Sequence, residues 1–126
     1  MVTKIQVIHA HDFLRATPEG RLDFEASRTL LVDLVAASAA LGDHDVVLDT
    51  RDMQSAMSAG ELWYLALELA RHGGALGRKK AVLCPRARFE NAEFFALCAQ
   101  NRGLNVRAFT SYEEAVEWFA AKDADA

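Results

Sequence analysis

Residues 30–48, LLVDLVAASAALGDHDVVL, join an apolar helical stretch to a glycine and then to a short β-prone run. The same order recurs in residues 62–71, Gly73 and 81–84, and again in residues 94–102, Gly103 and 106–109. Glycine accepts the left-handed backbone conformation that ends many helices. A helix that is repeatedly followed by a buried strand indicates crossover connections. We therefore predict an α/β fold with a single mixed, mostly parallel sheet of four to five strands and about four helices.

Shorter signals place the elements that precede these units. Residues 4–8, KIQVI, alternate polar and apolar side chains as a half-buried edge strand does, and residues 13–16 form a candidate second strand. Pro18 and Gly20 predict a turn, and Asp23 is a candidate N-cap for the first helix. The pairing of the first strand depends on long-range contacts that the sequence does not show.

Two capping boxes mark the starts of later helices. They are Ser58-Ala59-Gly60-Glu61 and Ser111-Tyr112-Glu113-Glu114. In such a box the serine side chain accepts a hydrogen bond from the amide three residues later, and the glutamate reaches back to the serine amide. We expect the second and the last helix to begin at these boxes, and a third helix to cover residues 89–102.

Length and composition indicate one domain. The chain has 126 residues, of which 52% are hydrophobic, and we expect a single domain over residues 1–121 with a frayed tail over 122–126. A net charge of −4 argues against a nucleic-acid surface, and no apolar run approaches the roughly 20 residues that cross a bilayer. The N-terminus lacks the apolar core of a signal peptide, and two cysteines without a CxxC spacing indicate reduced thiols. These features predict a cytoplasmic protein without a transmembrane segment.

The second helix is apolar over most of its surface. Its polar side chains form one narrow stripe, which consists of Glu61, Tyr64, Glu68, Arg71 and His72. A helix that lies on a sheet needs an apolar arc of only about 100°, so Trp63 and Leu67 must contact something else. Either a neighbouring helix of the same chain covers them, or they belong to a subunit interface or an apolar ligand groove. Leu62 and Ala70 complete this candidate interface or groove.

No catalytic, metal or cofactor motif is complete. Residues 56–60, AMSAG, lack the first glycine of a G-x-S-x-G nucleophile elbow, and a plain helix cap explains Ser58 as well. His9 and His11 share one strand face but have no identifiable third ligand. An enzymatic role needs Ser58 or Cys84 as the nucleophile, and neither has a base at a recognisable spacing. We expect a protein that is not an enzyme and that holds no cofactor and no metal.

Charged residues follow the predicted strands at their carboxyl ends, where ligands approach a parallel sheet. These ends supply Asp49, Arg51, Arg86 and Arg88. Ser58 stands at a nearby helix N-terminus, where the helix dipole favours anions. Together these residues are a candidate switch or anion site for a phosphate or carboxylate group. The alternative is that the arginines form loop ion pairs with Asp49 and Asp52.

Three groups of residues carry a family resemblance. They are residues 20–24, GRLDF; residues 46–49, VVLD, with 58–63, SAGELW; and residues 106–109, VRAF, with 112–119, YEEAVEWF. Their sequences and their order resemble the SpoIIAA-like family, relatives of the STAS domains of anti-sigma-factor antagonists. The resemblance spans nearly the whole chain. It implies a mixed sheet backed by helices, in a protein that binds partners without catalysis.

The resemblance also implies a site at the start of the second helix. In the antagonist proteins an Asp-Ser-Ser-Gly segment stands there and is phosphorylated to switch partner binding. Here the aligned residues are Met57-Ser58-Ala59-Gly60, so the acid is missing and Ala59 stands at the usual phospho-acceptor position. Ser58 remains as a hydroxyl. The chain is also similar to lipid-binding domains of the SEC14 type, which suits the wide apolar face of the second helix.

Two functional hypotheses follow from these observations. The first is a non-enzymatic STAS-like interaction or regulatory module, which binds a protein partner or associates with itself as a homodimer through the apolar helix face. The second is a SEC14-related carrier that holds a small apolar or amphipathic, lipid-like ligand between helices. Arg86, Arg88 or Ser58 then lies at the polar end of that ligand.

Overall fold

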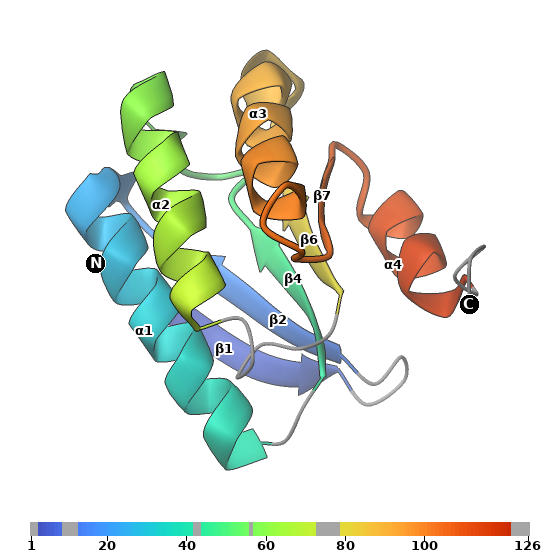
Figure 1. The fold of residues 1–126 in the computed structure, drawn as a ribbon. Coiled ribbons are helices and arrows are strands. Elements are labelled where there is room, and N and C mark those ends of the chain that lie inside the picture. The colour runs from blue at the N-terminus through green and yellow to red at the C-terminus, as the bar shows by residue number, and fades with distance from the viewer. Residues whose placement is uncertain (1–2, 9–12, 42–43, 56, 73–78, 122–126) are drawn as a thin grey trace.

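The computed structural model describes residues 3–8, 13–41, 44–55, 57–72 and 79–121. The elements in chain order are β1 (Thr3–Ile8), β2 (Phe13–Pro18), β3 (Arg21–Leu22), α1 (Phe24–Leu41), β4 (Asp45–Asp49), β5 (Gln54–Ser55), α2 (Ala59–Arg71), β6 (Lys80–Leu83), the 3₁₀ turn η1 (Arg86–Arg88), α3 (Phe89–Gln100), β7 (Val106–Phe109) and α4 (Tyr112–Ala120). Figure 1 shows α1, α2 and α3 side by side over one face of a sheet, with α4 set apart from them.

The main sheet has five strands in the order β1-β2-β4-β6-β7. Strand β1 pairs antiparallel with β2, and the other neighbouring pairs are parallel. The predicted mixed, mostly parallel sheet is therefore confirmed, and so is the predicted edge position of the first strand. One detail differs from the expected single sheet. Gln54 and Ser55, in the connection between β4 and α2, form a second, two-stranded parallel sheet with β3.

The larger hydrophobic core lies between the sheet and the three helices α1, α2 and α3. Side chains alternate across a strand, and Leu14 and Val46 point into this core. The helices contribute apolar side chains spaced by three and four residues. The buried ones are Leu30, Leu31, Leu34, Leu62, Leu65, Ala66, Leu69, Phe95, Ala96 and Ala99.

A smaller core lies on the opposite face of the sheet, beneath α4. Phe13 and Val47, the neighbours of Leu14 and Val46, point to this side. The ring of Phe13 is fully buried, and its centroid lies 5.4 Å from that of Phe119 and 6.2 Å from that of Tyr112. A single short helix covers this face, so its packing depends on a few aromatic contacts.

Local signals in the sequence define the helix ends. Gly103 has φ +84°, the Leu104 amide donates to the Ala99 carbonyl over 3.1 Å, and α3 ends there as predicted. The corresponding predictions for Gly42 and Gly73 lie outside the described residues. At the other end of a helix, the Asp23 carboxylate accepts a hydrogen bond from the Ala26 amide over 2.8 Å, which confirms the predicted N-cap of α1.

Both predicted serine caps are present. The Ser58 hydroxyl accepts from the Glu61 amide over 3.2 Å, and the Glu61 carboxylate accepts from the Ser58 amide over 3.0 Å, which completes a capping box at α2. At the second predicted box only the serine half occurs among the described residues: the Ser111 hydroxyl accepts from the Glu114 amide over 3.4 Å, without the return bond to the Glu114 carboxylate. Among the described residues, no helix has the length and apolar character needed to cross a membrane.

Candidate functional site

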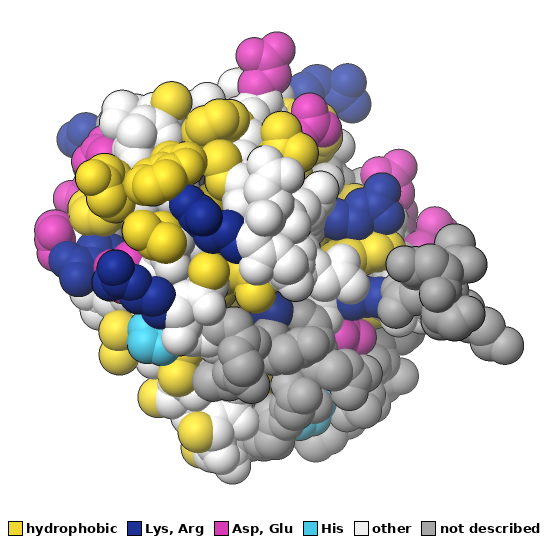
Figure 2. Space-filling model, viewed as in Figure 1, with side chains coloured by type: hydrophobic (Ala, Val, Ile, Leu, Met, Phe, Trp, Pro, Cys, Tyr) yellow, Lys and Arg dark blue, Asp and Glu magenta, His cyan; other side chains and the backbone are white. Residues whose placement is uncertain are grey.

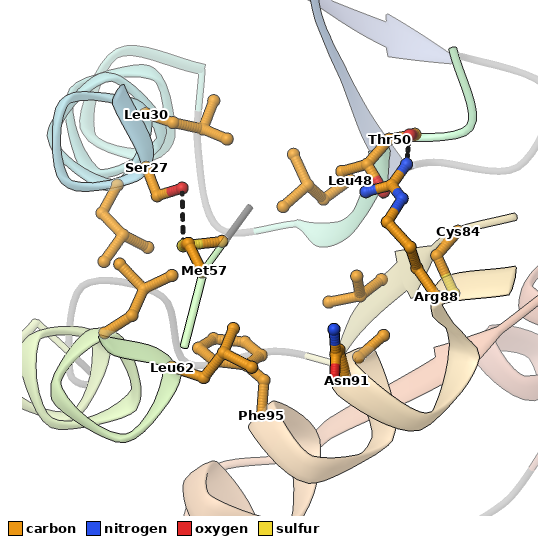
Figure 3. Close-up of a pocket in the computed structure, with 14 residues that line it drawn as sticks. Ser27, Leu30, Leu48, Thr50, Met57, Leu62, Cys84, Arg88, Asn91 and Phe95 are labelled. Carbon is orange, nitrogen blue, oxygen red and sulfur yellow. Dashed lines mark hydrogen bonds between the residues drawn. The ribbon is translucent and has the colours of Figure 1, made fainter. Parts of the chain in front are cut away.

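An apolar cavity of about 80 Å³ lies between the three core helices and the carboxyl ends of β4 and β6. Helix α1 contributes Leu30, α2 contributes Leu62, and α3 contributes Phe95. Figure 3 shows these side chains around the cavity, with Thr50, Arg88 and Asn91 as the main polar groups beside it. The Thr50 hydroxyl donates to the Leu83 carbonyl over 2.9 Å, so its proton is already engaged. The cavity therefore offers an apolar interior and a polar side near η1.

Arg88 joins the start of α3 to the loop that follows β4. Its Nη2 atom donates to the Thr50 carbonyl over 2.6 Å and to the Met53 carbonyl over 2.8 Å. Within the part of the chain that the structure describes, no carboxylate forms an ion pair with this guanidinium. Within the described residues, its positive charge is therefore not neutralised by a carboxylate. Arg86, two residues earlier, is exposed and does not line the cavity.

The buried thiol of Cys84 also lines the cavity. Burial raises the pKa of Cys84, and the nearby charge of Arg88 opposes this shift only in part. A raised pKa keeps the thiol protonated and weakly nucleophilic at neutral pH. Cys84 thus behaves as a small apolar wall of the cavity and not as an activated nucleophile.

Asp49 organises a second polar cluster at the end of β4. Its carboxylate accepts from the Arg15 side chain over 2.9 Å and from the Arg51 side chain over 3.0 and 2.9 Å, and it also accepts from the Arg51 amide. Burial alone would raise the pKa of Asp49, but the hydrogen bonds from Arg51 and Arg15 outweigh it and lower the pKa. The guanidinium of Arg15 lies 5.2 Å from the centre of the Tyr112 ring. Asp49 and Arg51 therefore form a loop ion pair.

A group of large apolar side chains is exposed across α2 and α3. Trp63 is 42% exposed, Tyr64 58%, Phe94 38% and Leu97 53%, and we call these four residues the α2–α3 patch. Trp63 and Tyr64 are in edge contact, with ring centroids 5.1 Å apart, and the Arg102 guanidinium lies 4.9 Å above the Trp63 ring. Figure 2 shows hydrophobic side chains gathered over the upper parts of α2 and α3, with a basic side chain across them.

The remaining candidates from the sequence lie in different environments. Leu62 is buried and lines the cavity, whereas Leu67 and Ala70 are half-buried on α2. Ser58 is exposed at the N-terminus of α2 and does not line the cavity, although its neighbour Met57 does. The structure therefore does not bring Ser58 or Arg86 to the cavity that Arg88 lines. No cluster of three potential metal ligands occurs in the described ranges, and His9 and His11 lie outside them.

Three residues that sequence reasoning did not single out contribute to these sites. Arg15 pairs with Asp49, Asn91 lines the cavity, and Arg102 stacks on Trp63. Basic residues such as Arg15 in a strand and Arg102 after a helix are common on protein surfaces. Their positions in the sequence therefore did not indicate a functional role. Arg15 becomes significant only because β2 and β4 are neighbours, which places Arg15 opposite Val47.

The similarity of this chain to known proteins comes from solved structures. An uncharacterised protein with a SpoIIAA-like fold from Shewanella loihica PV-4 superposes with a TM-score of 0.59 and 15% identity, over 94% of this chain and 92% of that one. The unphosphorylated anti-sigma factor antagonist SpoIIAA superposes with a TM-score of 0.58 and 14% identity, over 96% of this chain and 100% of that one. The phosphorylated Bacillus cell fate determinant SpoIIAA superposes with a TM-score of 0.54 and 15% identity, over 93% of this chain and 98% of that one.

No protein-family model and no curated protein sequence matches the chain. The likeness, at identities near 15%, is one of fold, and it covers more than nine-tenths of this chain and of each matched chain. The resemblance inferred from the three sequence segments is confirmed at the level of the fold. The chain has a SpoIIAA-like fold.

Proposed function

We propose that the protein is a non-enzymatic, STAS-like interaction module that associates with a second copy of itself through the α2–α3 patch. The observation that supports the proposal is the exposure of Trp63, Tyr64, Phe94 and Leu97 on adjacent helices. Contiguous exposed apolar side chains, aromatic ones above all, are typical of protein interfaces. One solved structure with this fold is that of an anti-sigma factor antagonist, SpoIIAA.

The charged side chains beside the α2–α3 patch favour a second copy of this chain as its binding partner. Arg102 lies across Trp63, and Glu93 precedes Leu97 by one helical turn and is exposed. In a two-fold dimer the same surface faces itself. A basic and an acidic side chain near one apolar centre can therefore pair with their opposites on the other copy.

We expect Trp63→Asp to weaken self-association at least tenfold, because a charge in place of a central aromatic side chain typically costs about 2 kcal/mol or more of binding free energy. Leu67→Asp should have a smaller effect in the same direction, since Leu67 is half-buried beside the patch. The measurement is sedimentation velocity over a concentration series, with circular dichroism to verify folding. Val32→Asp is the matched control, because Val32 is 59% exposed on α1, outside the patch.

Two results would contradict the proposal. One is a wild-type protein that remains monomeric throughout the series. The other is a folded Trp63→Asp variant with the same dimer dissociation constant as the wild type and the Val32→Asp control.

The cavity supports a second proposal, which is that the protein binds a small ligand. Pockets for drug-sized ligands occupy about 300–1,000 Å³, whereas this cavity has about 80 Å³. A lipid-like ligand requires α1, α2 and α3 to move apart, so the lipid-carrier form of the hypothesis has less support. A small amphipathic ligand fits without such a movement.

We also propose Ser58 as a candidate switch, because its hydroxyl is exposed at the N-terminus of α2. Ser58→Ala should lower the free energy of unfolding by about 1 kcal/mol through loss of the cap, whereas Ser58→Asp should retain most of the cap. Urea unfolding measures both variants. A switch at this position predicts that Ser58→Asp, which carries a negative charge, changes the dimer dissociation constant while Ser58→Ala does not. Equal dissociation constants for both variants contradict it.

A further inference from the structure

The cavity between α1, α2 and α3 combines an apolar interior with an uncompensated cation. Its walls are leucine, valine, methionine and phenylalanine side chains, and Arg88 and Asn91 stand on the side that faces η1. We propose that this cavity binds a short-chain monocarboxylate, with its hydrocarbon tail in the apolar interior and its carboxylate against Arg88. This site is separate from the α2–α3 patch and does not depend on the proposed self-association.

The volume sets the length of the tail. A protein cavity of about 150 Å³ holds one benzene molecule. By that scale the present cavity, at about 80 Å³, accommodates roughly three to four carbon atoms. Butanoate and pentanoate have tails of this length. Acetate leaves most of the cavity unfilled, and the end of an octanoate tail has to remain outside.

The charges around the cavity favour an anion. Arg88 donates from Nη2 to the carbonyls of Thr50 and Met53, and its Nε and Nη1 donate no hydrogen bond to the described residues. Nε and Nη1 lie on different edges of the guanidinium, so each can donate one charge-assisted hydrogen bond to a carboxylate oxygen. Asn91 also lines the cavity, and Figure 3 shows its side chain apart from the Arg88 guanidinium, which lies against Thr50. Arg88 and Asn91 lie at the start of α3, where the helix dipole adds positive potential.

No acidic group competes for this position. The carboxylate of Asp49, the residue before Thr50, is held by Arg15 and Arg51. Among the described residues, no aspartate and no glutamate lines the cavity. Cys84 remains a neutral thiol because burial raises its pKa. A bound carboxylate therefore meets one cation and no anion. The carboxyl edge of the parallel strands is also where ligands of open α/β sheets bind.

The first test uses the wild-type chain and a ligand series. Acetate, butanoate, pentanoate, octanoate and butan-1-ol are titrated at constant ionic strength, and amide shifts are followed by two-dimensional NMR. We expect the affinity to rise about fourfold for each methylene from acetate to pentanoate and to rise no further for octanoate. Butan-1-ol, which lacks the carboxylate, should bind at least tenfold more weakly than butanoate. Equal affinities of acetate and pentanoate, equal affinities of butanoate and butan-1-ol, or no saturable shift would each overturn the proposal.

The second test uses two arginines on the same turn. Arg88→Gln should lower butanoate affinity at least tenfold, whereas Arg86→Gln should leave it unchanged within twofold, because Arg86 does not line the cavity. If Arg88→Gln fails to fold, Ala92→Leu decides the question. This variant fills the cavity, leaves the bonds from Arg88 to the Thr50 and Met53 carbonyls in place, and should abolish the chain-length dependence. Trp63→Asp should retain full carboxylate affinity, so either proposal can fail alone.

Discussion

Phe13→Ala should lower the free energy of unfolding by about 4 kcal/mol, the expected cost of removing a buried phenylalanine side chain. Phe13 is fully buried under α4, and its ring contacts the rings of Tyr112 and Phe119. Few side chains pack between α4 and this face of the sheet. The space left by the substitution therefore cannot be filled by movement of neighbouring core side chains. Urea unfolding monitored by circular dichroism measures the change.

Phe94→Ala is the matched control for this prediction. Phe94 is 38% exposed on α3, so its removal leaves no closed cavity and should cost about 1 kcal/mol or less. A loss for Phe13→Ala that is no larger than the loss for Phe94→Ala would show that α4 does not depend on the aromatic contacts of Phe13.

Asp49→Asn should lower the free energy of unfolding by about 2 kcal/mol at pH 7. The Asp49 side chain is only 7% exposed and neutralises two guanidinium groups, Arg15 at 29% and Arg51 at 40% exposure. Removing the carboxylate leaves two like charges side by side. The partial exposure of both arginines keeps the cost below the roughly 3–5 kcal/mol of a fully buried pair. Asp52→Asn is the control, because Asp52 is exposed in the same loop and should cost under about 0.5 kcal/mol.

The pH dependence of this effect has a definite sign. The pKa of Asp49 is lower in the folded protein than its ordinary value of 3.8, so the unfolded chain binds a proton first as the solution becomes acidic. The stabilisation by Asp49 is complete above the ordinary pKa and is lost as the pH falls through the folded-state pKa. The stability difference between the wild type and Asp49→Asn should therefore shrink below about pH 4. A difference that stays constant from pH 7 to pH 3 would contradict this account.

The parts of the fold that the sequence predicts are those set by neighbouring residues. The capping box of Ser58 and Glu61 lies within one helical turn, and Gly103 ends α3 through bonds to the preceding turn. Repeated helix-to-strand units predict parallel neighbours because a crossover leaves few other arrangements. The small sheet of β3 and β5 could not be predicted, because two-residue strands have no detectable periodicity.

The candidate site shows the same division between local and long-range information. The wide apolar arc of α2 pointed to Trp63 and Leu67, and the structure leaves Trp63 exposed while Leu67 is half-buried. The contact of Arg15 with Asp49 joins residues 34 positions apart, and it exists only because β2 lies beside β4. Arg88 could be placed near a strand end, but its two carbonyl partners depend on how the preceding loop folds.

The strand order β1-β2-β4-β6-β7 has a consequence for how the protein is made. Apart from the short strands β3 and β5, each strand lies beside the one synthesised just before it. A chain that emerges from the ribosome N-terminus first can therefore extend its main sheet from one edge, strand by strand. No late strand has to insert between two neighbours that are already paired. Long-range pairing slows the folding of many parallel sheets, and here each pairing step waits only for the next helix and strand to be translated.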